Sequence, residues 1–127
     1  MKKKLAANYE RELQRKFWDN GFVCFRIAGS GSSTLPAADL VAIKNGKTYI
    51  IEVKTSRNGS IYLNDTQLRE LELIKEVGVE VYIAVKFIGS KKGWILIDLD
   101  KVLKDNKLTI ERLERDGIKL EDFVKNK

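Results

Sequence analysis

The chain has 127 residues, of which 43% are apolar and 33% are charged, as is ordinary for one globular domain. It contains no histidine, which excludes serine–histidine and cysteine–histidine catalysis and most zinc sites. Its single cysteine, Cys24, cannot form an internal disulfide and fits an intracellular, cytoplasmic setting. The net charge of +6 favours a polyanionic partner such as nucleic acid, although a basic surface can also serve solubility alone. No apolar run approaches the roughly 20 residues of a membrane span, and the start of the chain predicts no signal peptide.

The predicted elements begin with a helix over residues 4–20, because apolar residues recur every fourth position up to Phe17. The later elements are, in chain order, a strand over 22–28, a loop over 29–36, strands over about 39–45 and 47–55, a helix over 65–77, strands over 79–87 and 94–99, and a short helix near 120–124. This order predicts the α/β fold class, with a central mixed five-stranded sheet flanked by helices in a single domain over 1–127. The core is expected over about 4–99, with 100–127 as a C-terminal extension that packs on it.

An Asn-Gly pair near residue 45 separates two apolar runs and predicts a tight β-hairpin, because both central residues of a type I′ turn need positive φ. A two-residue turn fixes the register, so that Val41 faces Ile50 and, further along, Asp39 faces Glu52. Directly opposed residues have Cβ atoms roughly 4.5–5.5 Å apart, where like charges are destabilising. Alternation along the second strand places Lys54 on the same face as Glu52. The sequence therefore predicts two carboxylates and one ammonium group on one side of the hairpin, with a cation between the acids.

An ion cluster on a solvated sheet edge is the alternative for this group, because such clusters are common in half-exposed sheets. Three observations favour a metal site instead. Asp39 follows a Gly/Ser-rich loop and Pro36, at a strand start. Val41 and Ile50 on the same face indicate partial burial, and opposed acids are costly without a cation.

Two glutamates of the first helix have different predicted surroundings. Glu10 borders the apolar stripe of the helix and can point toward the sheet, although a solvated position is the alternative. Glu12 has Lys16 one turn further on, and this spacing predicts a surface ion pair. Only Glu10 is therefore a candidate for the acidic site.

Glu52-Val53-Lys54, together with Asp39 and Pro36, has the sequence form of the PD-(D/E)XK nuclease core. A wider pattern resembles the archaeal-type Holliday junction resolvases over roughly residues 4–99. The segments that carry this resemblance are Tyr9–Leu13, Phe25–Ser32, Leu35–Ala42 and Ile51–Lys54, with Gln67 at a glutamine position of that family. The chain departs from the pattern at Ala37-Ala38, where a proline directly before the aspartate is frequent, which leaves the path of the loop open.

The resemblance implies metal-dependent phosphodiester hydrolysis of four-way branched DNA in recombination and repair. It implies that Asp39, Glu52 and the backbone carbonyl of Val53 hold Mg²⁺, for which Mn²⁺ would substitute. Glu10 would assist the metal directly or through water, and Lys54 would orient the attacking water or stabilise the pentacovalent phosphate. The residues expected to contact DNA are Arg11, Arg26, Ser30, Ser32, Arg57 and Gln67, and Ser30 is also expected among the catalytic residues.

Some of these roles have plain alternatives. Arginine side chains at 11 and 26 could be ordinary surface charges, Ser30 could be a turn residue, and Gln67 could cap the second helix. Two other functions also stay open at this point. One is a different nuclease of the same superfamily that acts on duplex or flap DNA, and the other is a non-catalytic DNA-binding module.

One active site per chain implies a two-fold homodimer, because a junction has two strands to cut in symmetry. The apolar residues of the predicted helix over 65–77 span about 220° of its circumference at 100° per residue. A surface helix needs an apolar stripe of only about 100°. The surplus could meet a second subunit, or it could pack under the strand over 79–87. The expected partners are thus four-way DNA and a second copy of the chain, and no membrane. The expected location is the nucleoid.

Overall fold

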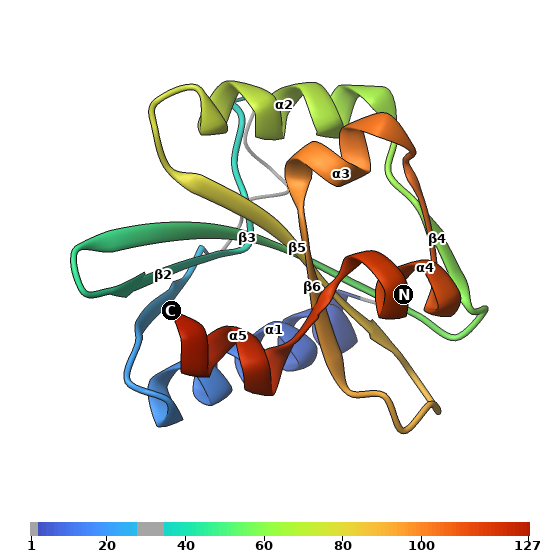
Figure 1. Ribbon diagram of the computed structural model, residues 1–127, viewed down its shortest axis with the longest axis horizontal. Helices are drawn as coiled ribbons and strands as arrows, with labels where there is room; N and C mark the ends of the chain where they lie inside the picture. Colours follow the sequence, from blue (N-terminus) through green and yellow to red (C-terminus); the bar gives the residue numbers. More distant parts are fainter. Residues whose placement is uncertain (1–2, 28–34) are drawn as a thin grey trace.

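The computed structural model describes residues 3–27 and 35–127. A mixed sheet of six strands forms its centre, with helices packed on both faces (Figure 1). In spatial order the strands are β1 (Val23–Arg26), β2 (Leu40–Lys44), β3 (Lys47–Ser56), β5 (Glu80–Phe87), β6 (Trp94–Asp98) and β8 (Ile118–Lys119). The pair β3 and β5 runs parallel, and the other neighbouring pairs run antiparallel. The predicted α/β fold class is confirmed.

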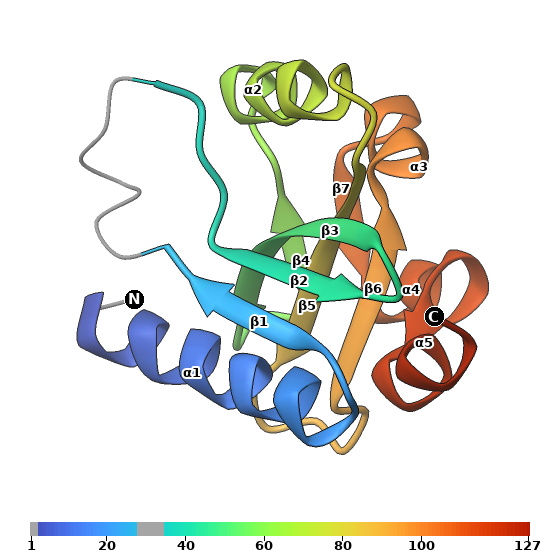
Figure 2. The same ribbon diagram turned by 90° about the vertical axis from the view of Figure 1, so that its left-hand side faces the viewer.

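Two layers of helices cover the sheet, one on each face (Figures 1 and 2). The first layer is α1 (Lys3–Asp19) with α5 (Leu120–Asn126), and the second is α2 (Asp65–Lys75) with α3 (Leu99–Lys104). A separate apolar core lies under each layer. A helix suited to crossing a bilayer is absent from the part of the chain that the structure describes.

The β2–β3 hairpin has the predicted turn and the predicted register. Both central residues of its Asn-Gly turn have positive φ, 52° and 77°. Val41 pairs with Ile50 as expected. The N–H of Asp39 donates to the Ile51 carbonyl at 3.2 Å, which carries the ladder one residue beyond the start of β2. Asp39 therefore faces Glu52 at the end of the hairpin opposite the turn.

Strand β3 lies in the middle of the sheet, so both of its faces are covered. Tyr49 and Ile51 point into the core under α1 and α5. Ile50 packs against the core under α2 and α3, and alternation puts Glu52 on that same side. Glu52 is only 7% exposed as a result. The alternative of a solvated edge cluster is therefore wrong for this strand.

From Ser60 onward the chain has more elements than the sequence predicted. A two-stranded ladder of β4 (Ser60–Tyr62) and β7 (Lys107–Thr109), the helices α3 and α4 (Ile110–Asp116), and the sixth strand of the sheet, β8, were all missing from the prediction. The strands concerned have only two or three residues each, too few to display a two-residue period. The prediction of five strands was wrong by this short edge strand.

Candidate active site

The carboxylates of Asp39 and Glu52 come together beside the first residues of the β2 strand. The Val53 N–H donates to Oδ2 of Asp39 at 2.8 Å and so ties this side chain to β3. Burial, and then the negative charge of Asp39, raise the pKa of Glu52 to about 8. The like-charge conflict that the hairpin register predicted is therefore present in the fold.

Two neighbouring side chains partly compensate the Glu52 carboxylate. Oε2 of Glu52 accepts a hydrogen bond from Nε2 of Gln67 at 2.7 Å, and Nζ of Lys54 lies 3.6 Å from the same oxygen. Gln67 is placed by the start of α2, where its own N–H donates to Oδ1 of Asn64 at 2.7 Å. The capping side chain thus belongs to Asn64, and the alternative of Gln67 as the cap is wrong.

Glu10 approaches the same region from α1. Its Oε1 accepts a hydrogen bond from Nε of Arg26 at 2.9 Å, so neither residue is an ordinary solvated charge. Burial and the charge of Asp39 raise the pKa of Glu10, and they outweigh the opposing effect of Arg26. The negative charge of Asp39 is therefore felt by both glutamates, Glu10 and Glu52.

The donor atoms suit a hard divalent ion, because carboxylate oxygens are what Mg²⁺ and Mn²⁺ prefer. Within residues 3–27 and 35–127, however, no three acidic or cysteine side chains come close enough together to hold a metal among them. Glu10 is turned to Arg26. The geometry offers an acid pair, Asp39 and Glu52, and Mg²⁺ commonly binds through one or two carboxylates while it keeps several waters.

A family model described as archaeal Holliday junction resolvase (Hjc) matches residues 1–127 of this sequence. The chain belongs to this family. A crossover junction endodeoxyribonuclease Hjc of Archaeoglobus fulgidus is 38% identical over an alignment 94 residues long, which covers 72% of this chain and 67% of that protein. The Hjc of Sulfurisphaera tokodaii is 30% identical over an alignment 128 residues long, which covers 97% of this chain and 88% of that protein.

A solved structure supports the fold of the resolvase family for this chain. The Holliday junction resolvase Hjc of Archaeoglobus fulgidus superposes with a TM-score of 0.80 at 24% sequence identity. The superposition covers 93% of this chain and 98% of that one. The resemblance stated from the sequence motifs is confirmed for the family by the family model and the relatives, and for the fold by this structure.

Of the other residues expected to contact DNA, Arg11 and Arg57 lie within the described residues, and Ser30 and Ser32 do not. Arg11 on α1 is exposed, with its NH1 3.4 Å from Oδ1 of Asn8. Arg57 is exposed in the loop between β3 and β4. Ser30 and Ser32 fall outside the described residues, and their proposed roles stay predictions from the family resemblance.

Sequence reasoning misassigned Glu12. Its carboxylate does not pair with Lys16 but accepts hydrogen bonds from Lys86 and Trp94, each at 2.7 Å. The sequence did contain a signal, because Lys86 is a lone lysine inside the apolar strand β5. A charged residue at a covered position needs a partner, and Glu12 is that partner.

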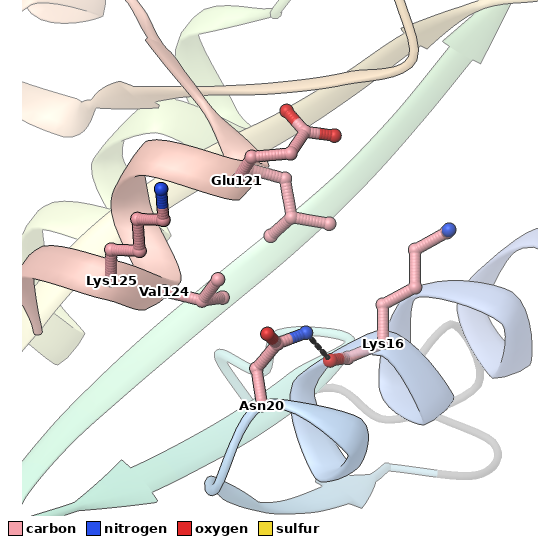
Figure 3. Close-up of a pocket in the computed structure, with 6 residues that line it drawn as sticks. Lys16, Asn20, Glu121, Val124 and Lys125 are labelled. Carbon is pink, nitrogen blue, oxygen red and sulfur yellow. Dashed lines mark hydrogen bonds between the residues drawn. The ribbon is translucent and has the colours of Figure 1, made fainter.

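A groove of about 240 Å³ runs between α1 and α5 (Figure 3). It is lined by Lys16, Asn20, Leu120, Glu121, Val124 and Lys125. The Asn20 amide already donates to the Lys16 carbonyl at 2.7 Å. None of the candidate catalytic residues lines this groove, so it is separate from the acid pair.

Proposed function

We propose that this chain resolves four-way DNA junctions by paired, magnesium-dependent hydrolysis of two phosphodiester bonds, as a homodimer. Membership of the family makes it a crossover junction endodeoxyribonuclease. The observation that supports the metal-dependent mechanism best is the pair of the half-buried Asp39 and the buried Glu52, with Lys54 beside it. Because four-way junctions arise in chromosomal DNA, the proposed place of action is inside the cell, at the nucleoid.

The proposed Mg²⁺ ligands are Asp39, Glu52 and the Val53 carbonyl, with Glu10 assisting through water. Such an ion would neutralise phosphate charge and lower the pKa of its bound water. Mn²⁺ is expected to substitute, because it accepts the same oxygen donors. Burial and the negative charge of Asp39 raise the pKa of Glu52, and the positive ion would offset both, so metal binding is expected to release a proton.

The chain's own side chains have separate tasks in this proposal. Gln67 holds one oxygen of Glu52 through its 2.7 Å hydrogen bond, which leaves the orientation of the carboxylate fixed. Lys54, partly exposed, presents its ammonium group to the attacking water and to the charge that develops on phosphate. Arg11 and Arg57, both exposed, are proposed to bind backbone phosphates of the arms.

A homodimer is supported by apolar side chains that are exposed to solvent on the single chain. Leu68 and Leu71 of α2 are buried against the sheet, so that part of the apolar arc is internal. Leu73 of the same helix is 51% exposed, and Val77, two residues beyond the end of the helix, is 80% exposed. Strand β1 adds two more exposed apolar residues, Val23 and Phe25. We propose that α2 meets a second copy through its outer face, because a stable interface needs an apolar centre.

The dimer is tested by Val77→Glu, which places a charge on the proposed interface at a largely exposed position. Sedimentation at micromolar concentration should change from dimer to monomer, with the thermal midpoint of the monomer fold almost unchanged. The matched control is Glu76→Gln, an exposed change one residue away. A parent chain that sediments as a monomer at this concentration contradicts the proposal.

The activity is tested with a panel of four-way, flap, linear duplex and single-stranded DNA in Mg²⁺ and in EDTA. The proposal expects cleavage of the four-way substrate at two symmetric positions, and only with the metal. Equal cutting of flap or linear duplex would favour a different nuclease of the superfamily. Tight junction binding without metal-dependent cleavage would favour a non-catalytic DNA-binding module.

A further inference from the structure

Helix α1 is tied to the sheet along both flanks of its buried stripe. Leu13 and Phe17 on that stripe are fully buried. Glu10 and Glu12 lie on opposite sides of it, because successive residues are about 100° apart around a helix. Glu10 bonds to Arg26 of β1, whereas Glu12 bonds to residues of β5 and β6.

The flank on the Glu12 side depends on one small network, which consists of Glu12, Lys86 and Trp94. A single oxygen of Glu12, Oε2, accepts from Nζ of Lys86 and from Nε1 of Trp94, at 2.7 Å each. The Lys86 ammonium group also lies 5.5 Å from the ring centre of Tyr9 and 5.7 Å from that of Trp94. The carboxylate therefore joins the helix to two adjacent strands at once.

The flank on the Glu10 side has its own ties at the edge strand β1. Nε2 of Gln14 and Nε1 of Trp18 both donate to the Cys24 carbonyl, at 3.0 Å and 2.8 Å. Hydrogen bonds on one flank alone would let α1 rotate about the line of contact between α1 and β1. The Glu12 network supplies the second line of contact on the opposite flank.

We propose that Glu12 is a positioning residue for the active site, and this inference rests on the function proposed above. With Lys86 and Trp94, Glu12 fixes the rotation of α1 about its own axis and thereby holds Glu10. A side-chain carboxylate lies about 6 Å from the helix axis, so a rotation of about 10° moves it by about 1 Å. A displacement of about 1 Å in a catalytic arrangement can lower the rate about 100-fold.

The test compares Glu12→Ala with Glu114→Ala. Glu114 pairs with Lys92 at 3.2 Å on the surface, so its removal also deletes one lysine–glutamate ion pair, but one that does not touch α1. Glu12→Ala should lower the single-turnover cleavage rate 10- to 100-fold and change the junction dissociation constant less than threefold. Glu114→Ala should leave both at the parent values. Glu12→Gln keeps the shape and one neutral acceptor, and should give an intermediate rate even if Glu12→Ala folds poorly.

A second measurement needs neither metal nor activity. The Nε–H of Arg26 bonds to Glu10, so its nitrogen–proton resonance in a two-dimensional NMR spectrum reports the position of that carboxylate. Glu12→Gln should shift or broaden this signal together with the indole signal of Trp94. The indole signal of Trp18, which bonds to a backbone carbonyl on the other flank, should stay in place.

Three outcomes would overturn the inference. One is a parent-like cleavage rate in both Glu12 variants while Asp39→Asn is inactive. Another is a loss of junction affinity with an unchanged rate, which would assign Lys86 to phosphate binding instead. The third is an unchanged Arg26 signal in a folded Glu12→Gln protein. If Asp39→Asn still cleaves, the proposed metal site fails, but the NMR result still decides whether Glu12 positions Glu10.

Discussion

Glu52 and Arg112 both carry ionisable side chains and both are buried, 7% and 8% exposed, yet their surroundings are opposite. Arg112 in α4 lies among acceptors. Its guanidinium donates to a carboxylate and to three backbone carbonyls, those of Lys101, Asp105 and Lys107. Every one of these contacts favours the charged form, and they join α3, β7 and α4 into one unit.

Glu52 instead faces a group of its own sign. Asp39 and burial disfavour its charged form, and Lys54 and Gln67 compensate only in part. A buried charge that is hydrogen-bonded to groups of opposite polarity can stabilise the fold. A buried charge next to a like charge destabilises the fold unless a cation binds there. The contrast predicts that substitutions at the two positions affect different properties of the protein.

The largest expected effect is on cleavage at the acid pair. Glu52→Gln or Asp39→Asn removes one of the two charges that would attract the metal, so the single-turnover rate should fall about 1,000-fold or more, which is about 4 kcal/mol of transition-state stabilisation. Junction binding, measured in EDTA, should stay within a few-fold of the parent chain. Retained cutting in Mg²⁺ by either variant would exclude this pair as the metal site.

Arg112→Ala should have the second-largest effect, and it should be on stability alone. Removing the guanidinium leaves three carbonyls without their donors, at an expected loss of about 3–4 kcal/mol in the free energy of unfolding. For a chain of this size the thermal midpoint should fall by roughly 10–15 °C. The cleavage rate well below that midpoint should match the parent.

Arg115→Ala is the matched control, because Arg115 lies three residues further on in α4 and its side chain is largely exposed. Its thermal midpoint should move by less than about 3 °C, as is usual for surface substitutions. Equal shifts of the thermal midpoint for Arg112→Ala and Arg115→Ala would show that the buried contacts of Arg112 contribute nothing to the stability of the fold. A lost cleavage rate in folded Arg112→Ala would remove the contrast with Glu52.

The sequence revealed Glu52 but not Arg112, for a physical reason. The position of Glu52 follows from a two-residue turn and a two-residue period, which are local rules. Arg112 sits in a charged stretch that resembles a solvated surface. Its burial depends on where carbonyls 5 to 11 residues away are placed by a chain path with no recognisable turn signals.

Distance along the chain explains the other differences from prediction. Glu12 meets Lys86 and Trp94 across 74 and 82 residues, so only the tertiary fold could reveal that network. The i+4 rule offered Lys16 as a nearer partner, and tertiary packing overrode it. Glu10 was placed correctly relative to the sheet, because its position on the border of an apolar stripe is again a local property.

The smallest expected effect concerns the pH dependence of stability without metal. The pKa of Glu52 is about 8 in the fold against an ordinary 4.5, so between these values the native state holds a proton that the unfolded chain has lost. The free energy of unfolding should therefore fall as pH rises from about 4.5 to about 8. At about 1.4 kcal/mol per pKa unit, and with relaxation of the native state allowed for, a loss of about 2–3 kcal/mol is expected.

Glu52→Gln removes this dependence, because glutamine does not titrate. In EDTA the variant should be more stable than the parent at pH 8 and nearly equal to it near pH 4.5, as measured by urea unfolding across that range. The exposed change Glu114→Gln should leave the slope of the parent intact. Other acids with shifted pKa values, such as Glu12, are common to both chains and cancel in the difference. A parent that is equally stable at pH 5 and pH 8 would mean that Asp39 and burial do not oppose ionisation of Glu52.

Added Mg²⁺ should stabilise the parent at pH 8 and the variant much less, since a ligand stabilises only the state that binds it. If Glu52→Gln were less stable than the parent at pH 8 in EDTA, Glu52 would be, like Arg112, a buried charged residue that stabilises the fold.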